Sequence, residues 1–166
     1  MSILIDIQRA CTSEKIPSDI AITRWVKSVL DNHDDPIELS IRVVGEAESA
    51  ALNQQYRGKS GATNVLSFPF SAVTPEPLPL LGDLVICAPI VTLEASQQKK
   101  AIEAHWAHIV IHGVLHLLGY DHGDDDEAQT METLETEILL GLNYPAPYTD
   151  TTEHNWATNE RRIPNN

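Results

Sequence analysis

One segment decides how this chain must fold: His112-Gly113-Val114-Leu115-His116-Leu117-Leu118-Gly119-Tyr120-Asp121-His122. On a helix, the side chains of His112 and His116 lie on the same face about one turn apart, roughly 6 Å along the axis. Two imidazoles at this spacing can bind one ion. The segment therefore predicts a helix that presents both histidines to a common ligand.

A third ligand requires the chain to turn back, because the next turn of a straight helix would carry it away from the ion. Gly119 follows His116 at a position where a left-handed glycine can end the helix and return His122 to the metal. The spacing His-x-x-x-His-x-x-Gly-x-x-His is that of a zinc-protease motif, and three protein ligands are typical of catalytic zinc. We predict one zinc ion per chain, bound by His112, His116 and His122 at the C-terminal end of a long helix.

The residue after His112 separates this chain from the zinc proteases. Those enzymes have a glutamate there, which takes a proton from the metal-bound water, whereas this chain has Gly113. Peptide hydrolysis by that mechanism therefore lacks its base. Asp83 and Asp121 are candidate substitutes, although each is better explained as a turn residue or as a hydrogen-bond acceptor near the site.

Two further histidines precede the motif. His108 and His116 are two helical turns apart, roughly 12 Å, so they cannot share an ion. We predict that His105 and His108 have structural roles or support the ligands by hydrogen bonds. Lone histidines on an apolar helix are usually of this kind, but three at the spacing of His112, His116 and His122 favour a metal site.

Composition predicts a single cytoplasmic domain. The chain has 166 residues, of which 42% are hydrophobic, enough to bury a core without disulfide bonds. Cys11 and Cys87 are too few and too far apart to suggest a disulfide framework or a cysteine zinc site. The N-terminal stretch from Met1 to Asp6 has neither the pattern of a signal peptide nor the length of a membrane span. The formal net charge of -13 disfavours long-range attraction to nucleic acid, so an RNA function would need a local basic patch.

The pattern around the histidine segment alternates between strands and helices. Period-two alternation and β-branched residues predict strands at Ser2–Gln8, Ile37–Val44, Thr63–Phe70 and Gly82–Ala88. Helical spacing predicts helices at Asp19–Leu30, Glu46–Tyr56, Pro89–Leu118 and Asp124–Leu140, the third with a break near Lys99 and Lys100 and the last stopped by Gly141. This order favours an α+β fold with one mixed sheet. We predict one metallohydrolase domain at residues 1–148 and a flexible C-terminal tail at residues 149–166.

Three other stretches, together with the histidine segment, resemble the family of YbeY-type rRNA maturation factors. They are Leu52-Asn53-Gln54-Gln55-Tyr56-Arg57-Gly58-Lys59, Thr63-Asn64-Val65-Leu66-Ser67-Phe68-Pro69 and Gly82-Asp83-Leu84-Val85-Ile86. The resemblance covers nearly the whole chain. It implies a zincin-like α+β fold with a mixed four-stranded sheet, and a zinc-dependent, single-strand-specific endoribonuclease that acts in ribosomal RNA maturation and ribosome quality control.

The resemblance also implies roles for particular residues and partners. His112, His116 and His122 match the family's zinc ligands, and Arg57 matches its functionally important arginine, the predicted catalytic residue. A planar guanidinium is suited to clamping a non-bridging phosphate oxygen. Many members have an aspartate where this chain has Asn64, so we assign Asn64 no role in proton transfer. The implied partners are single-stranded or ribosomal RNA, ribosomal proteins and a ribosome-assembly GTPase, with no membrane.

RNA cleavage is compatible with the missing glutamate. The 2′-hydroxyl of RNA can be the nucleophile, and attack by water activated by the ion is an equal alternative. Two other functions remain open. A metallohydrolase of a non-nucleic-acid substrate is disfavoured by Gly113, and a non-catalytic ribosome assembly factor braced by zinc is disfavoured by three ligands instead of four.

Overall fold

The computed structural model describes residues 3–12, 15–31, 33, 36–70, 79–121 and 123–148. Two predictions therefore lie outside the described residues: the position of His122 and the tail at residues 149–166.

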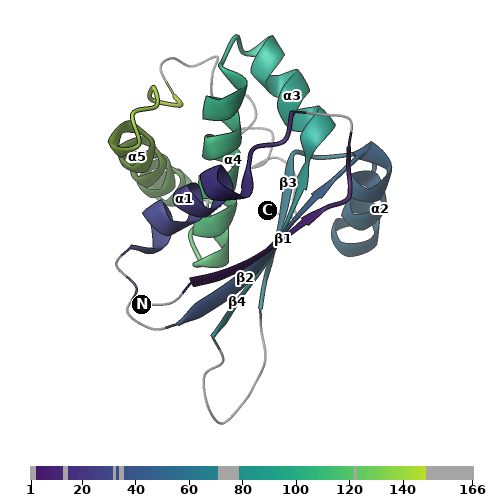
Figure 1. The fold of residues 1–166 in the computed structure, drawn as a ribbon, viewed down its shortest axis with the longest axis horizontal. Coiled ribbons are helices and arrows are strands. Elements are labelled where there is room, and N and C mark those ends of the chain that lie inside the picture. Colours follow the sequence, from purple (N-terminus) through teal and green to yellow (C-terminus); the bar gives the residue numbers. More distant parts are fainter. Residues whose placement is uncertain are drawn as a thin grey trace.

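In the part of the chain that the structure describes, four strands form one mixed sheet (Figure 1). They are β1 (Ile3–Arg9), β2 (Ile37–Val44), β3 (Val65–Pro69) and β4 (Leu80–Cys87). The spatial order is β1-β2-β4-β3, in which β1, β2 and β4 are parallel and β3 runs antiparallel to β4 at the edge. The predicted α+β class with a mixed four-stranded sheet is confirmed.

Within the described residues, five helices pack around this sheet. They are α1 (Asp19–Leu30), α2 (Glu46–Arg57), α3 (Ala88–Gln97), α4 (Ile102–Leu117) and α5 (Asp125–Gly141). Figure 1 shows α1, α4 and α5 grouped on one side of the sheet and α2 apart from them. Helix α4 is apolar around most of its circumference, so it lies in the core, packed against the sheet and against α1, α3 and α5.

Strand alternation divides the apolar side chains between the two faces of the sheet. Leu39, Ile41 and Val43 of β2 point into the large core that contains α1 and α4. A smaller cluster on the opposite face includes Val44 and Val85, with Leu52 of α2 packed against it. Because successive side chains of a strand point to opposite faces, the position of α4 determines which residues of each strand can reach the histidines.

Helix boundaries follow local chemistry closely, with one correction. Ser18 caps α1 by accepting a bond from the backbone N–H of Ala21, and the predicted break between α3 and α4 contains Lys99 in the left-handed conformation. The predicted end of α5 at Leu140 agrees to within one residue with the observed end at Gly141, but Gly141 is itself helical and is not the left-handed residue that follows the helix. The left-handed residue is Asn143, with a φ of 69°, and asparagine tolerates this conformation better than most side chains.

Candidate metal centre

The two predicted ligands on α4 lie side by side. The Nε2 atoms of His112 and His116 are 3.1 Å apart, and the side chain of His112 is almost completely buried. Two nitrogen ligands of one tetrahedral zinc ion, each about 2.0–2.1 Å from it, would be roughly 3.3 Å apart. The two imidazoles therefore fit a shared ion, with the nitrogen chemistry that zinc prefers.

Gly119 ends α4 in the way the sequence predicts. Its φ is +103°, the N–H of Gly119 donates to the carbonyl of His116, and the N–H of Tyr120 donates to the carbonyl of Leu115. These two bonds form a Schellman-type helix end. In the described part of the chain, no group of three or more His, Cys, Asp or Glu residues could hold a metal. The role of His122 as third ligand stays a prediction.

A buried carboxylate that the sequence reasoning missed supports His112 from α5. His112 Nδ1 lies 2.6 Å from Glu135 Oε2, and the side chain of Glu135 is almost completely buried. Burial alone would raise the pKa of Glu135, but the neighbouring His112 and His108 hold it well below its usual range. Sequence contained a signal for this residue, because Glu135 is an acid at helical spacing between Met131 and Leu139 on the apolar face of α5.

His108 and His105 have the supporting roles that the sequence predicts. His108 Nε2 lies 3.1 Å from the hydroxyl of Tyr148 and 3.3 Å from Glu135 Oε2, and burial lowers its pKa to about 4. His105 Nε2 contacts Glu94 at 2.9 Å, and the same carboxylate accepts bonds from the amide of Asn64. Asn64 thus fastens the start of β3 to α3, a structural position.

The structure gives a physical reason for glycine at position 113. A Cβ atom there would lie 2.9 Å and 3.1 Å from the two terminal methyl carbons of Leu84, which is fully buried in β4. Gly113 thus lets α4 approach the sheet closely. A glutamate at this position, as in the zinc-protease motif, would therefore have to displace the side chain of Leu84.

Arg57 ends α2 and reaches the edge strand. Its Nη2 donates to the carbonyl oxygen of Ser67 at 2.7 Å, and its guanidinium carbon lies 5.6 Å from the ring centre of Phe68. The hydroxyl of Ser67 in turn approaches the carbonyl oxygen of Gly113 at 3.4 Å. Arg57 is therefore held against β3, the strand whose Ser67 hydroxyl contacts α4 at Gly113, the residue directly after His112.

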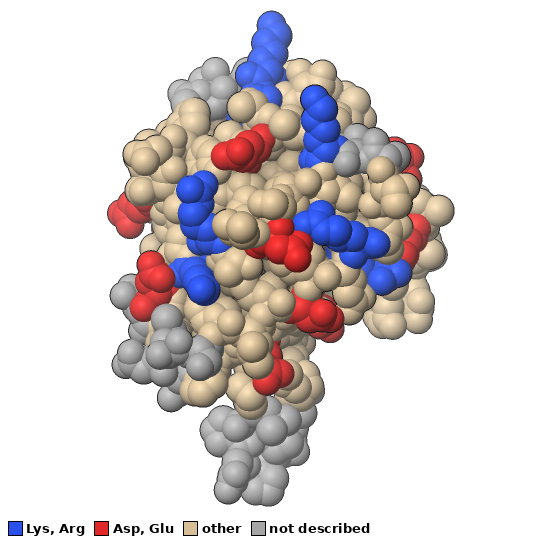
Figure 2. All heavy atoms as spheres, in the orientation of Figure 1, with Lys and Arg blue, Asp and Glu red and all other residues tan. Residues whose placement is uncertain are grey.

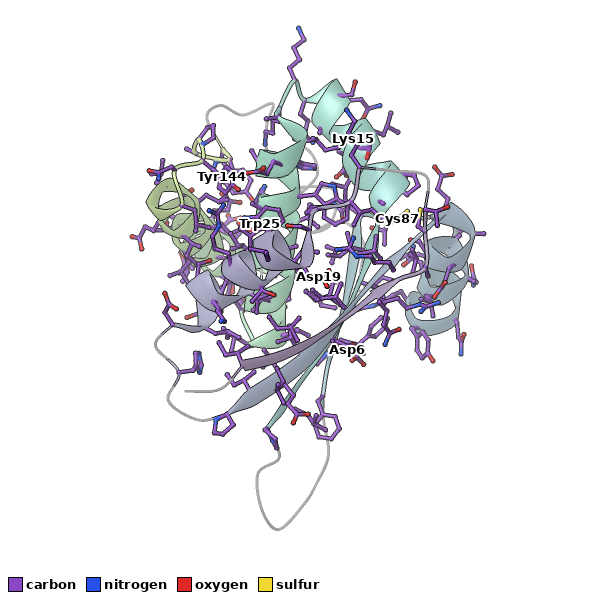
Figure 3. All side chains as sticks on the ribbon, viewed as in Figure 1. Asp6, Lys15, Asp19, Trp25, Cys87 and Tyr144 are labelled. Carbon is purple, nitrogen blue, oxygen red and sulfur yellow. The ribbon has the colours of Figure 1, made fainter. Side chains whose placement is uncertain are left out.

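Asp83 does not fit the role of substitute base. It lies on β4 between Gly82 and Leu84, so its side chain points to the face opposite α4, where it accepts a hydrogen bond from Ser40. Asp6 of β1, labelled in Figure 3, lies opposite Ser40 in the register of the two strands. Its side chain therefore belongs to the same face of the sheet as those of Ser40 and Asp83. The strand period thus separates Asp83 from the histidine pair by the thickness of the sheet.

Charge on the visible surface is mixed. In Figure 2, lysine and arginine side chains are interspersed with aspartate and glutamate on one face of the molecule. The surface seen there has no broad basic field, as the excess of acids leads one to expect. None of the helices among the described residues is long and apolar enough to cross a membrane.

The mixed sheet and the histidine pair at the end of α4 define an α+β protein with a candidate metal centre. The chain matches the family described as Endoribonuclease YbeY over residues 6–143, and it belongs to that family. Membership implies a hydrolase that cleaves RNA in the maturation of ribosomal RNA. The fold is also similar to the solution structure of TM1509 from Thermotoga maritima, with a TM-score of 0.56 and 24% identity over 96% of this chain and 95% of that one.

Proposed function

We propose that this protein is a zinc-dependent, single-strand-specific endoribonuclease of ribosomal RNA maturation and ribosome quality control. The observation that carries the metal dependence is the His112–His116 pair, whose Nε2 atoms are 3.1 Å apart. In this proposal His122 completes the ligand set for one zinc ion per chain, and the domain is zincin-like. Ribosomal proteins, a ribosome-assembly GTPase and a cytoplasmic location belong to the same proposal.

Attack by the 2′-hydroxyl of the RNA, with its proton released to solvent, does not require the glutamate that activates metal-bound water in the zinc proteases. A bound divalent ion supplies Lewis acidity that polarises a phosphoryl oxygen. His112 and His116 would hold it through Nε2, and the 2′-hydroxyl of the RNA can serve as the nucleophile. This route makes single-stranded RNA the favoured substrate, because a flexible strand can align its 2′-oxygen with the phosphorus and the leaving oxygen.

Arg57 is the proposed phosphate clamp. The Ser67 carbonyl and the Phe68 ring orient its guanidinium beside the edge strand that contacts α4. A preorganised cation stabilises charge that develops on a phosphate in the transition state, and it does so without reorganisation at the moment of reaction.

The test combines metal analysis with substrate choice. Purified protein and the variant His116→Ala are compared for zinc content and for cleavage of labelled single-stranded RNA, the matching duplex and casein. We expect one zinc per chain and cleavage of single-stranded RNA alone in the parent, with both lost in the variant. Casein cleavage would favour the protease alternative, and zinc binding without any cleavage would favour the assembly factor.

A further inference from the structure

Glu135 is an unusual residue for its place in the fold. The other buried residues of α5 are Ala128, Met131 and Leu139, all apolar. A carboxylate taken out of water loses its hydration, and it is tolerated only where charges and hydrogen bonds replace that hydration. An apolar side chain would serve the packing of α5 on α4 equally well, so packing alone does not explain an acid here.

The two carboxylate oxygens of Glu135 have separate partners. Oε2 lies 2.6 Å from His112 Nδ1 and 3.3 Å from His108 Nε2, whereas Oε1 accepts a hydrogen bond of 2.8 Å from the hydroxyl of Tyr148. Tyr148 comes from the segment after α5, and its ring also packs edge-on against His108. The carboxylate is therefore held from two sides, with one oxygen directed at His112.

This geometry selects one tautomer of His112. A carboxylate has no hydrogen to donate, so the short contact requires the proton of His112 to be on Nδ1. The lone pair is then on Nε2, the atom that faces His116. In metal sites, a carboxylate behind a histidine ligand fixes ring orientation and makes the ligand nitrogen more basic.

We propose that Glu135 is the positioning residue of the metal centre: it fixes the Nε2 lone pair of His112 toward the ion and supplies a buried negative charge behind it, with Tyr148 holding the carboxylate in place. This inference rests on the proposed zinc site. It extends that site to α5 and to the segment that follows it, so the end of the domain takes part in metal binding.

The experiment compares three variants of the full chain. Glu135→Gln keeps the size and one acceptor oxygen but removes the charge, and Tyr148→Phe removes only the bond to Oε1. Glu137→Gln is the matched control, because it makes the same chemical change at an exposed position of α5. Zinc affinity is measured by competition with a chromophoric chelator, and the tautomer of His112 in metal-free protein is read from its ring ¹⁵N shifts.

We expect about a 10–100-fold loss of zinc affinity in Glu135→Gln, a smaller loss in Tyr148→Phe and none in Glu137→Gln. The metal-free parent should show His112 protonated on Nδ1. Parent-like zinc affinity in Glu135→Gln overturns the proposal, as does protonation on Nε2 in the parent. If Glu135→Gln does not fold, unchanged affinity in Tyr148→Phe overturns the part assigned to Tyr148, and the tautomer in the parent still decides the part assigned to Glu135.

Failure of the zinc site itself gives a different result. In that case the parent and Glu137→Gln bind no zinc, and the proposed function is wrong. The tautomer of His112 is a separate test that does not need bound zinc: protonation on Nε2 would overturn the positioning role of Glu135 whether or not the parent binds zinc.

Discussion

Glycine at position 113 affects both the packing of α4 against the sheet and the chemistry available beside His112. We expect Gly113→Ala to destabilise the protein by about 1 kcal/mol, because the crowding of Leu84 exceeds the gain in helix propensity. Gly141→Ala is the matched control, since nothing lies within 4 Å of a Cβ at that helical position, and it should be neutral or slightly stabilising. Urea unfolding of both variants provides the measurement. Equal stability of the two would show that Leu84 moves aside freely.

Arg57 is the residue whose function can be tested most directly. Arg57→Ala should leave zinc content intact and slow RNA cleavage by on the order of 3 kcal/mol in activation free energy, since guanidinium cannot be a ligand but can stabilise charge. Arg57→Lys retains the charge without the planar fork, so it should recover part of the rate. Rates are compared at matched zinc occupancy and matched melting temperature. If Arg57→Ala cleaves as fast as the parent, the clamp must be sought elsewhere, with Lys59 the next candidate.

At the level of elements, Tyr144 joins the segment after α5 to α1 and α4. Its hydroxyl accepts bonds from Arg24 and from the indole of Trp25, beside it in Figure 3, and donates to Glu103 at 2.6 Å. Burial and then the bond to Glu103 raise the pKa of Tyr144. The folded state thus keeps this proton at higher pH than the unfolded state, whose tyrosine pKa is about 10.

This linkage predicts a loss of stability at alkaline pH. The contribution of the hydroxyl is complete below about pH 10 and disappears as pH rises through the folded pKa of Tyr144. We expect Tyr144→Phe to be about 1 kcal/mol less stable than the parent at neutral pH, and the difference to shrink above pH 10. Denaturant unfolding at several pH values measures it. A constant difference across this range would mean that the hydroxyl does not titrate with folding.

Elements were predictable where the chemistry is local. Caps, strand alternation and the left-handed Gly119 each depend on a few neighbouring residues, and the structure agrees with them. Contacts between distant elements were not predictable in this way. The bond from Arg57 to Ser67 and the contact of Glu135 with His112 depend on how α2 and α5 pack, and periodicity does not determine that packing. The candidate ligands on α4 could therefore be predicted from the sequence. Glu135, the residue proposed to orient His112, could be identified only from the packing of α5 on α4.

At the scale of the whole molecule, the question is whether the fold depends on the metal, as it would for a structural metal site. The place of the histidine pair relative to the apolar core bears on this question. The main core joins α1, α4 and the sheet through fully buried side chains such as Trp25, Ile41 and Trp106. The pair lies toward the end of α4, so this apolar core does not depend on a metal to close it. We therefore expect chelated protein to stay folded, unlike small zinc domains that unfold without metal.

Zinc should still raise the melting temperature, because a ligand that binds only the folded state stabilises it by mass action. At a free zinc concentration of about 100 times Kd the gain is about 2.7 kcal/mol, or on the order of 5–10 °C for a chain of this size. His116→Ala should show no such shift while melting like the chelated parent. Thermal unfolding followed by circular dichroism, with and without chelator, measures both effects. If chelation alone unfolds the parent, the metal braces the fold, and the non-catalytic assembly factor becomes the better explanation of the site.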